Sequence, residues 1–101
     1  MKIAVTYEEE TGEIYQHFGH CHNFKIYHTE GGEITSASVV SSGTYGHGGL
    51  ATFLQKMGVD TLICGGIGGG AQNALKAAGI KFFGGVKGNA DKAVKSLITD
   101  S

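Results

Sequence analysis

The sequence of 101 residues predicts an α/β fold with a mixed five-stranded sheet and helices on both faces of that sheet. In the first 40 residues apolar and polar side chains alternate, which is the period of strands with one buried face. After residue 49 the apolar spacing changes to that of amphipathic helices, and short apolar runs typical of buried parallel strands separate the helical stretches. The 18 glycines punctuate these segments in a chain that contains no proline.

Three strands are expected first, arranged as an antiparallel meander. They cover residues 2–7, 24–28 and 34–40. Gly31 and Gly32 predict the hairpin between the second and third strands, because glycine adopts positive φ without steric cost. Ser36 and Ser38 on one face of the third strand indicate an edge that is partly exposed to water. A short extended piece within residues 13–18 leads from the first strand towards the second.

Two right-handed β-α-β crossovers are expected to follow, so that the last two strands run parallel to the first. The expected elements are a helix at residues 50–57, a strand at 59–64, a helix at 71–78, a strand at 80–83 and a helix at 90–98. Gly58 and Gly79 stand where the first two helices take left-handed C-terminal caps. Asn89 is expected to be the N-cap of the last helix. We expect residues 1–101 to form one domain.

Chain direction through these elements places four loops at one end of the sheet, which we call the rim. They are the loops at residues 17–22, 41–47, 65–70 and 84–88. The rim contains the carboxyl ends of the parallel strands, and open α/β sheets bind their ligands at those ends. We therefore expect the functional site at the rim.

The first rim loop concentrates the side chains that bind soft or borderline metals. Its candidate metal ligands are His17, His20, Cys21 and His22. The absence of a C-x₂-C spacing argues against a closed structural zinc site and favours one or two of these ligands completed from elsewhere. For any single histidine, a solvent-facing or backbone-bonding role is an alternative. The thiol of Cys21, in this polar loop, is expected to be more reactive than a buried thiol.

Glycine-rich positions of the rim are candidates for cofactor binding. They are Gly19, His47, Gly48, Gly66, Gly68 and Gly70. A glycine loop that opens a helix favours an anion, whereas His47 at a helix start is equally compatible with a structural role. The loop at 65–70 has the relaxed spacing of a dinucleotide fingerprint, but no acidic residue follows Phe83, which argues against NAD. Cys64 is expected to be a small buried side chain, and His28 a structural residue.

Composition excludes other functional classes. The 8 basic and 9 acidic side chains give no field that would attract nucleic acid or an anionic membrane. No apolar run reaches the ~20 residues of a membrane span, and the N-terminus lacks the profile of a signal peptide. Two cysteines are typical of a protein from a reducing cytoplasm. The meander with crossovers is the layout of ribonuclease H-like domains, but residues 2–7 contain no acid that could hold Mg²⁺, so nuclease activity is not expected.

Three motifs together carry a family resemblance. They are His17-Phe18-Gly19-His20-Cys21 ahead of Phe24, His47-Gly48-Gly49 ahead of a helix, and the glycine run at 65–70 followed by Ala71, Ala74, Leu75, Gly79 and Ile80. With them the chain resembles the dinitrogenase iron–molybdenum cofactor biosynthesis family over nearly its whole length. The resemblance implies a ribonuclease H-like fold without nuclease activity, and binding or carrying of an iron–sulfur or iron–molybdenum cluster or its precursor. It implies ligand positions at His17, Cys21 and His47, and nitrogenase or other cluster-assembly proteins as partners.

The leading hypothesis is a non-catalytic cytoplasmic protein that binds such a metal cluster at the rim. Metal–sulfur clusters are bulky anions, for which glycine loops supply N–H donors and a histidine or thiolate supplies an exchangeable anchor. Two alternatives remain open. A mononuclear-metal hydrolase would use a histidine-bound water and a base from the acidic turn at residues 8–10. An anion-binding regulatory or partner-binding domain would use the glycine loop alone.

Overall fold

The structure is a computed structural model, and it describes residues 1–43 and 49–99. Its strands are β1 (Lys2–Glu8), β2 (Glu13–Ile14), β3 (Asn23–Glu30), β4 (Glu33–Ser41), β5 (Thr61–Ile63) and β6 (Lys81–Phe83). Its helices are α1 (Leu50–Lys56), α2 (Gly69–Ala77) and α3 (Ala90–Thr99), with a short 3₁₀ helix, η1, at Phe18–His20. The mixed α/β class is therefore confirmed.

The sheet has the strand order β4-β3-β1-β5-β6, and β2 pairs with β1 outside this path. The meander pairs are antiparallel, whereas β5 lies parallel to β1 and β6 lies parallel to β5. All five expected strands are present, but the expected count was wrong because β2 adds a sixth. Gly12, with φ of 75°, turns the chain so that Ile14 pairs with Tyr7. Two residues are too few for a period of alternation, so the sequence pattern could not mark β2 as a strand.

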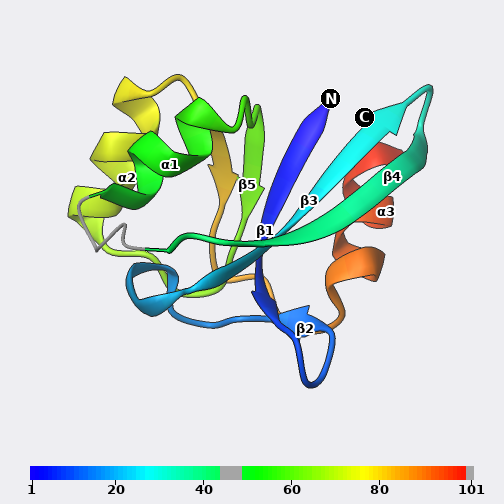
Figure 1. Cartoon of the computed structure of the whole chain (residues 1–101), viewed down its shortest axis with the longest axis horizontal. Coiled ribbons are helices and arrows are strands. Elements are labelled where there is room, and N and C mark those ends of the chain that lie inside the picture. The colour runs from blue at the N-terminus through cyan, green and yellow to red at the C-terminus, as the bar shows by residue number, and fades with distance from the viewer. Residues whose placement is uncertain (44–48, 100–101) are drawn as a thin grey trace.

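Helices cover both faces of the sheet, as expected (Figure 1). Helices α1 and α2 pack together on one face, where Leu54 and Leu75 belong to the same buried cluster as Ile26. Helix α3 packs on the other face, where Val94 joins the cluster of Ile3. The sheet is thus the middle layer of three, and its ends are left to the loops.

Helix ends follow the expected glycine and asparagine signals. Gly58 and Gly79 follow the first two helices with φ of 74° and 76°, a left-handed conformation that glycine adopts without strain. Asn89 caps α3, since its side-chain Oδ1 accepts a hydrogen bond of 3.0 Å from the N–H of Lys92. Helix α2 begins at Gly69, two residues before its expected start. Within the described residues, no helix is long and apolar enough to cross a membrane.

Candidate functional site

Two rim loops that are distant in sequence lie side by side. His17 and Gly66 form a parallel β-bridge. The N–H of Gly66 donates to the carbonyl of Gln16 over 2.6 Å, and the N–H of Phe18 donates to the carbonyl of Gly66 over 3.0 Å. The histidine loop is therefore fixed against the glycine loop by the backbone itself.

The other two rim loops are joined to this pair. The N–H of Gly85 donates to the carbonyl of Gly65 over 2.7 Å, and the N–H of Ser42 donates to the carbonyl of His22 over 2.8 Å. A Cβ atom on Gly65 would lie 2.6 Å from the Cα atom of Gln16, so the close approach of these loops requires glycine there. The four loops thus meet at one end of the sheet, as chain direction predicts, although only residues 41–43 of the second loop are described.

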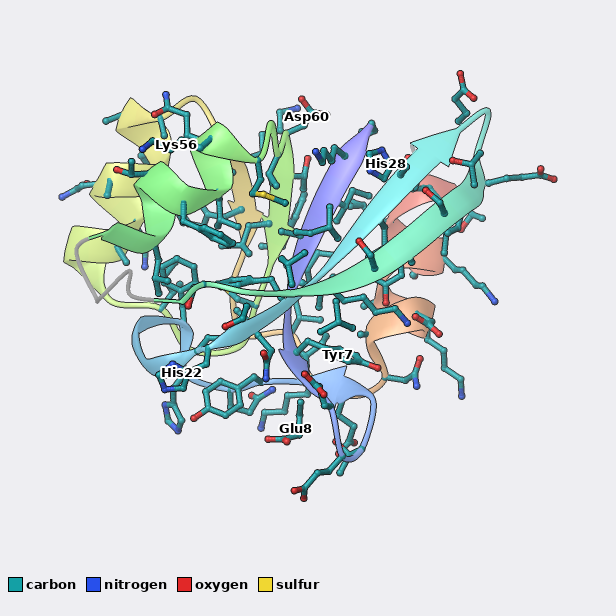
Figure 2. The ribbon with its side chains drawn as sticks, in the orientation of Figure 1. Tyr7, Glu8, His22, His28, Lys56 and Asp60 are labelled. Carbon is teal, nitrogen blue, oxygen red and sulfur yellow. The ribbon has the colours of Figure 1, made fainter. Side chains whose placement is uncertain are left out.

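The described histidines of the first loop point to solvent. His17 and His22 are both exposed, and the His17 ring lies edge-on to Tyr15 with 6.3 Å between ring centroids. Figure 2 shows His22 at the same end of the molecule as Tyr7 and Glu8, whereas His28 lies towards the opposite end. Among the described side chains, no three histidine, cysteine, aspartate or glutamate residues gather around a common point.

The expectation that Cys21 is a reactive thiol is wrong for this conformation. Cys21 is 3% exposed, and its Sγ atom donates to the carbonyl of Asn23 over 2.9 Å. Burial raises the pKa of this thiol, which keeps it protonated at neutral pH. The η1 turn explains the burial, because the N–H of Cys21 bonds to the carbonyl of Phe18 and the loop closes over the core. The sequence carried a signal for this, since Phe18, Cys21 and Phe24 recur every three residues.

Cys64 is a buried side chain, as predicted. It is fully buried in the cluster beneath α1 and α2, and burial raises its pKa to about 11. Both cysteines are free thiols.

Three successive glycines at the start of α2 have no structural need for glycine. Gly68 is the N-cap with φ of −77°, and Gly69 and Gly70 also lie outside the positive-φ region. A Cβ atom built on any of the three meets no atom of the described residues within 4 Å. This contrasts with Gly65 and Gly66, where the backbone of Gln16 is in close approach. Steric and conformational constraints explain the first two glycines of the run and leave Gly68–Gly70 unexplained.

The N-terminus of α2 also has no capping side chain. The N-cap residue is Gly68, which has no side chain to make a capping hydrogen bond, and no acidic residue stands in the first turn. The first intrahelical bond runs from the N–H of Gln72 to the carbonyl of Gly68, over 3.0 Å. The N–H groups of Gly69, Gly70 and Ala71 precede that bond and have no hydrogen-bond partner among residues 1–43 and 49–99, so they could donate to an anion, which the helix dipole also attracts.

The predicted site residues therefore divide into three groups. The structure brings together at the rim His17, His22, Gly19, Gly66, Gly68 and Gly70. It buries Cys21. The positions of His47 and Gly48 and the side chain of His20 lie outside the residues that the structure describes.

Sequence reasoning did not identify Gln16, which joins two rim loops. Its side-chain Nε2 donates to the carbonyls of Ile14 and Val86, over 2.9 and 3.2 Å, while its backbone carbonyl binds Gly66. A single glutamine in a short extended piece gives no periodic or motif signal, so its role emerges only when Val86 is brought near.

Comparison with known proteins gives four findings. The family model described as "Dinitrogenase iron-molybdenum cofactor" matches residues 1–100. The uncharacterized protein MJ0580 of Methanocaldococcus jannaschii is 30% identical over 103 residues, which cover 97% of this chain and 86% of that protein. The crystal structure of PH0822 aligns with a TM-score of 0.92 and 26% identity, over 100% of this chain and 91% of that one. The apo form of the orange protein from Desulfovibrio gigas aligns with a TM-score of 0.84 and 29% identity, over 98% of this chain and 88% of that one.

Proposed function

The chain belongs to the dinitrogenase iron-molybdenum cofactor family, and from this premise we propose that it binds and carries an iron–sulfur or iron–molybdenum cluster, or a precursor of one, at the rim. The observation that carries the proposal is the bridge between His17 and Gly66. It holds an exposed imidazole beside an uncapped helix N-terminus built from glycines. One side of this junction offers a metal ligand, and the other offers N–H donors.

The donor set suits a metal–sulfur cluster better than a bare metal ion. The sulfides of such a cluster accept hydrogen bonds, and the N–H groups of Gly69, Gly70 and Ala71 are available to donate them. The three glycines leave this surface free of side chains, so a bulky anion can approach the backbone closely. The imidazoles of His17 and His22 would coordinate iron at the cluster edge.

Cys21 is not assigned as a ligand of the folded state described above, because its thiol would first have to turn out of the core. His20 and His47 stay candidates on sequence grounds alone. One or two exposed imidazoles form an open and exchangeable attachment, which suits a protein that releases its cargo rather than one that encloses a structural metal.

We propose further that the protein is a non-catalytic carrier, that residues 1–101 act as a single domain, and that it works in the cytoplasm. Its delivery partners are nitrogenase or other cluster-assembly proteins. The strand order β4-β3-β1-β5-β6 supports assigning the fold to the ribonuclease H-like group. Family membership supports the cluster as cargo.

Anaerobic reconstitution with ferrous iron and sulfide tests the proposal. We expect visible absorption and bound iron and sulfide in the wild type, and loss of most of both in a His17→Ala/His22→Ala variant. His28→Ala is the matched control, because it removes an exposed imidazole from the opposite end of β3 and should leave cluster loading unchanged. Equal loading of all three proteins, or no loading of the wild type, would refute cluster binding at these histidines.

A second pair of variants tests the glycine surface. Gly69→Ala/Gly70→Ala places two methyl groups over the N–H donors without a clash in the protein alone, and it should reduce cluster loading. Asn73→Ala, at an exposed position later on α2, is the control.

The uncapped N-terminus of α2 also favours a second candidate function, the binding of a small anion such as phosphate. Titration with inorganic phosphate separates the two functions. Phosphate binding that persists in the His17→Ala/His22→Ala variant, together with absent cluster loading in the wild type, would favour the anion-binding regulatory domain.

A further inference from the structure

Strand β6 is an open edge of the sheet. It is the last strand in the order, and its one described partner strand is β5. Phe83, at its end, is 44% exposed and is one of the few large apolar side chains on the surface. An edge strand with an exposed aromatic residue is able to accept a further strand.

Backbone geometry shows which groups of β6 face outwards. The N–H of Lys81 bonds to the carbonyl of Asp60 over 3.1 Å, and the carbonyl of Phe83 accepts from the N–H of Cys64 over 3.0 Å. In a parallel pair, alternate residues direct both polar groups towards the same neighbour. The N–H and carbonyl of Phe82, which lies between them, are therefore directed away from β5.

A hollow of about 650 Å³ lies on the α3 side of this edge, and we call it the α3-side hollow. Its apolar lining includes Ile63, Phe83 and Leu97, and Lys87 and Lys92 stand in its wall. Phe83 pairs in register with Ile63, which is buried. The exposed Phe83 ring therefore continues the apolar surface of Ile63 out to the edge of the sheet. The hollow therefore suits an apolar side chain held close to positive charge.

A second hollow, of about 450 Å³, lies along the same strand, and we call it the α2-side hollow. It is lined by Ile80 and Phe82 together with Lys76 and Lys81. No acidic residue lines either hollow within the described part of the chain. Two basic hollows thus flank one open strand.

Basic residues also outnumber acidic residues in the part of the sequence that forms α2, β6 and α3. Five of the eight basic residues are lysines between positions 76 and 95. Asp91 is the only acid from residue 61 to residue 99, and it is paired with Lys25 at 2.9 Å. Among the described residues, none of the lysines that line the two hollows forms an ion pair with a carboxylate.

We propose that β6 binds an extended acidic segment of a partner protein, which adds to the sheet as a further strand. Side chains alternate across a strand, so large apolar residues of that segment would enter the α3-side hollow over Phe83. The acidic residues between them would face the α2-side hollow, where Lys76 lies. Residues 84–88 continue from β6 into the rim, so the bound segment would end beside the proposed cargo site.

A second copy of this chain fits the edge less well than an acidic segment. Pairing two β6 strands would bring Lys76 and Lys81 of both copies together, and like charges in direct opposition are destabilising. The same charges attract glutamate and aspartate, and so they give the edge selectivity for its partner. This inference is independent of whether the rim binds a cluster.

The test uses the intact protein and a fluorescein-labelled octapeptide of alternating glutamate and leucine. Fluorescence anisotropy should show saturable binding that weakens as salt is raised, because the lysines are exposed. A control peptide of the same sequence is N-methylated at alternate residues. It keeps its charge and side chains, but one of its edges lacks the N–H groups that would bond to β6. We expect it to lose binding by at least tenfold.

Three protein variants locate the site. Lys76→Glu, in the α2-side hollow that the acidic residues would face, should weaken binding about tenfold. Lys95→Glu changes the net charge equally but Lys95 lines neither hollow, so this variant should change binding less than twofold. Phe83→Ala removes the exposed ring and should also weaken binding, while circular dichroism verifies that each variant is folded.

The proposal is overturned if the wild type does not bind the peptide, or if the N-methylated peptide binds equally well. It is also overturned if Lys95→Glu weakens binding as much as Lys76→Glu, since that would indicate diffuse attraction. Sedimentation that shows a dimer dissociated by Phe83→Ala would assign the edge to a second copy instead.

Discussion

Replacing Gly69 and Gly70 with alanine should stabilise the protein, although these positions belong to the proposed site. Neither glycine has positive φ, and a Cβ atom on either would meet no atom of residues 1–43 or 49–99 within 4 Å. Alanine restricts the unfolded chain without straining the folded one, so each change should add about 0.4–1 kcal/mol to the free energy of unfolding. The double variant should gain about 1–2 kcal/mol.

Urea denaturation of the metal-free protein, followed by circular dichroism, measures this gain. For a domain of this size, each kcal/mol corresponds to a rise in Tm of about 4–8 °C. Gly65→Ala is the contrasting variant, because its Cβ atom would lie 2.6 Å from the Cα atom of Gln16 and should destabilise the protein. The reasoning is refuted if the double variant loses stability, since the glycines would then be needed by the fold itself. If the double variant gains stability but loses cluster loading, Gly69 and Gly70 are needed for binding rather than for folding.

Two further predictions concern residues outside the glycine loop. Asp91 accepts hydrogen bonds from Lys25 and Tyr27, and the Tyr27 hydroxyl holds the pKa of Asp91 below its ordinary value, as Lys25 also does. Its contribution to stability should therefore be present above pH ~4 and lost as the pH falls towards its folded-state pKa, and Asp91→Asn should remove this dependence in acid-dependent urea unfolding. Half of the Asp91 side chain is exposed, so the effect should be below about 1 kcal/mol, and an equal acid sensitivity in wild type and variant would contradict the assignment. Iodoacetamide should modify Cys21 and Cys64 slowly in the folded protein and rapidly in urea, because both thiols are buried with raised pKa values; rapid labelling of folded Cys21 at neutral pH would show that the rim loop opens.

Most of the strands and helices were predictable from the alternation of apolar and polar residues and from the positions of the glycines. The expected meander is present, since β3 pairs antiparallel with both β1 and β4. Both faces of β1 are buried, however, whereas no residue of the edge strand β4 is buried. Gly58 and Gly79 end α1 and α2 where left-handed caps are needed. Strand β2 could not be predicted, since Glu13 and Ile14 are held by pairing with β1 and by a hydrogen bond from Ile14 to Gly88. Contacts of this kind depend on tertiary structure and leave no local pattern.

The sequence predicted that the histidine and glycine loops lie together at one end of the sheet, but it did not predict the burial of Cys21. Chain direction alone placed the histidine and glycine loops together, because the carboxyl ends of parallel strands share one edge. Because histidines surround Cys21 in the sequence, we expected it to lie in a polar loop. In the structure Cys21 is buried in the same cluster as Phe18 and Phe24, which stand three residues before and after it. The polarity of neighbouring residues was a weaker indicator of burial than the three-residue apolar spacing, because adjacent side chains can point in different directions.

The hydrogen bonds between Gln16, Phe18 and Gly66 use main-chain atoms only. The side chain at position 17 takes no part in these bonds, so a substitution there can change the group that the loop presents to solvent without breaking the attachment of one loop to the other. The main chain thus supplies a constant frame, on which the chemistry of the exposed group can vary independently.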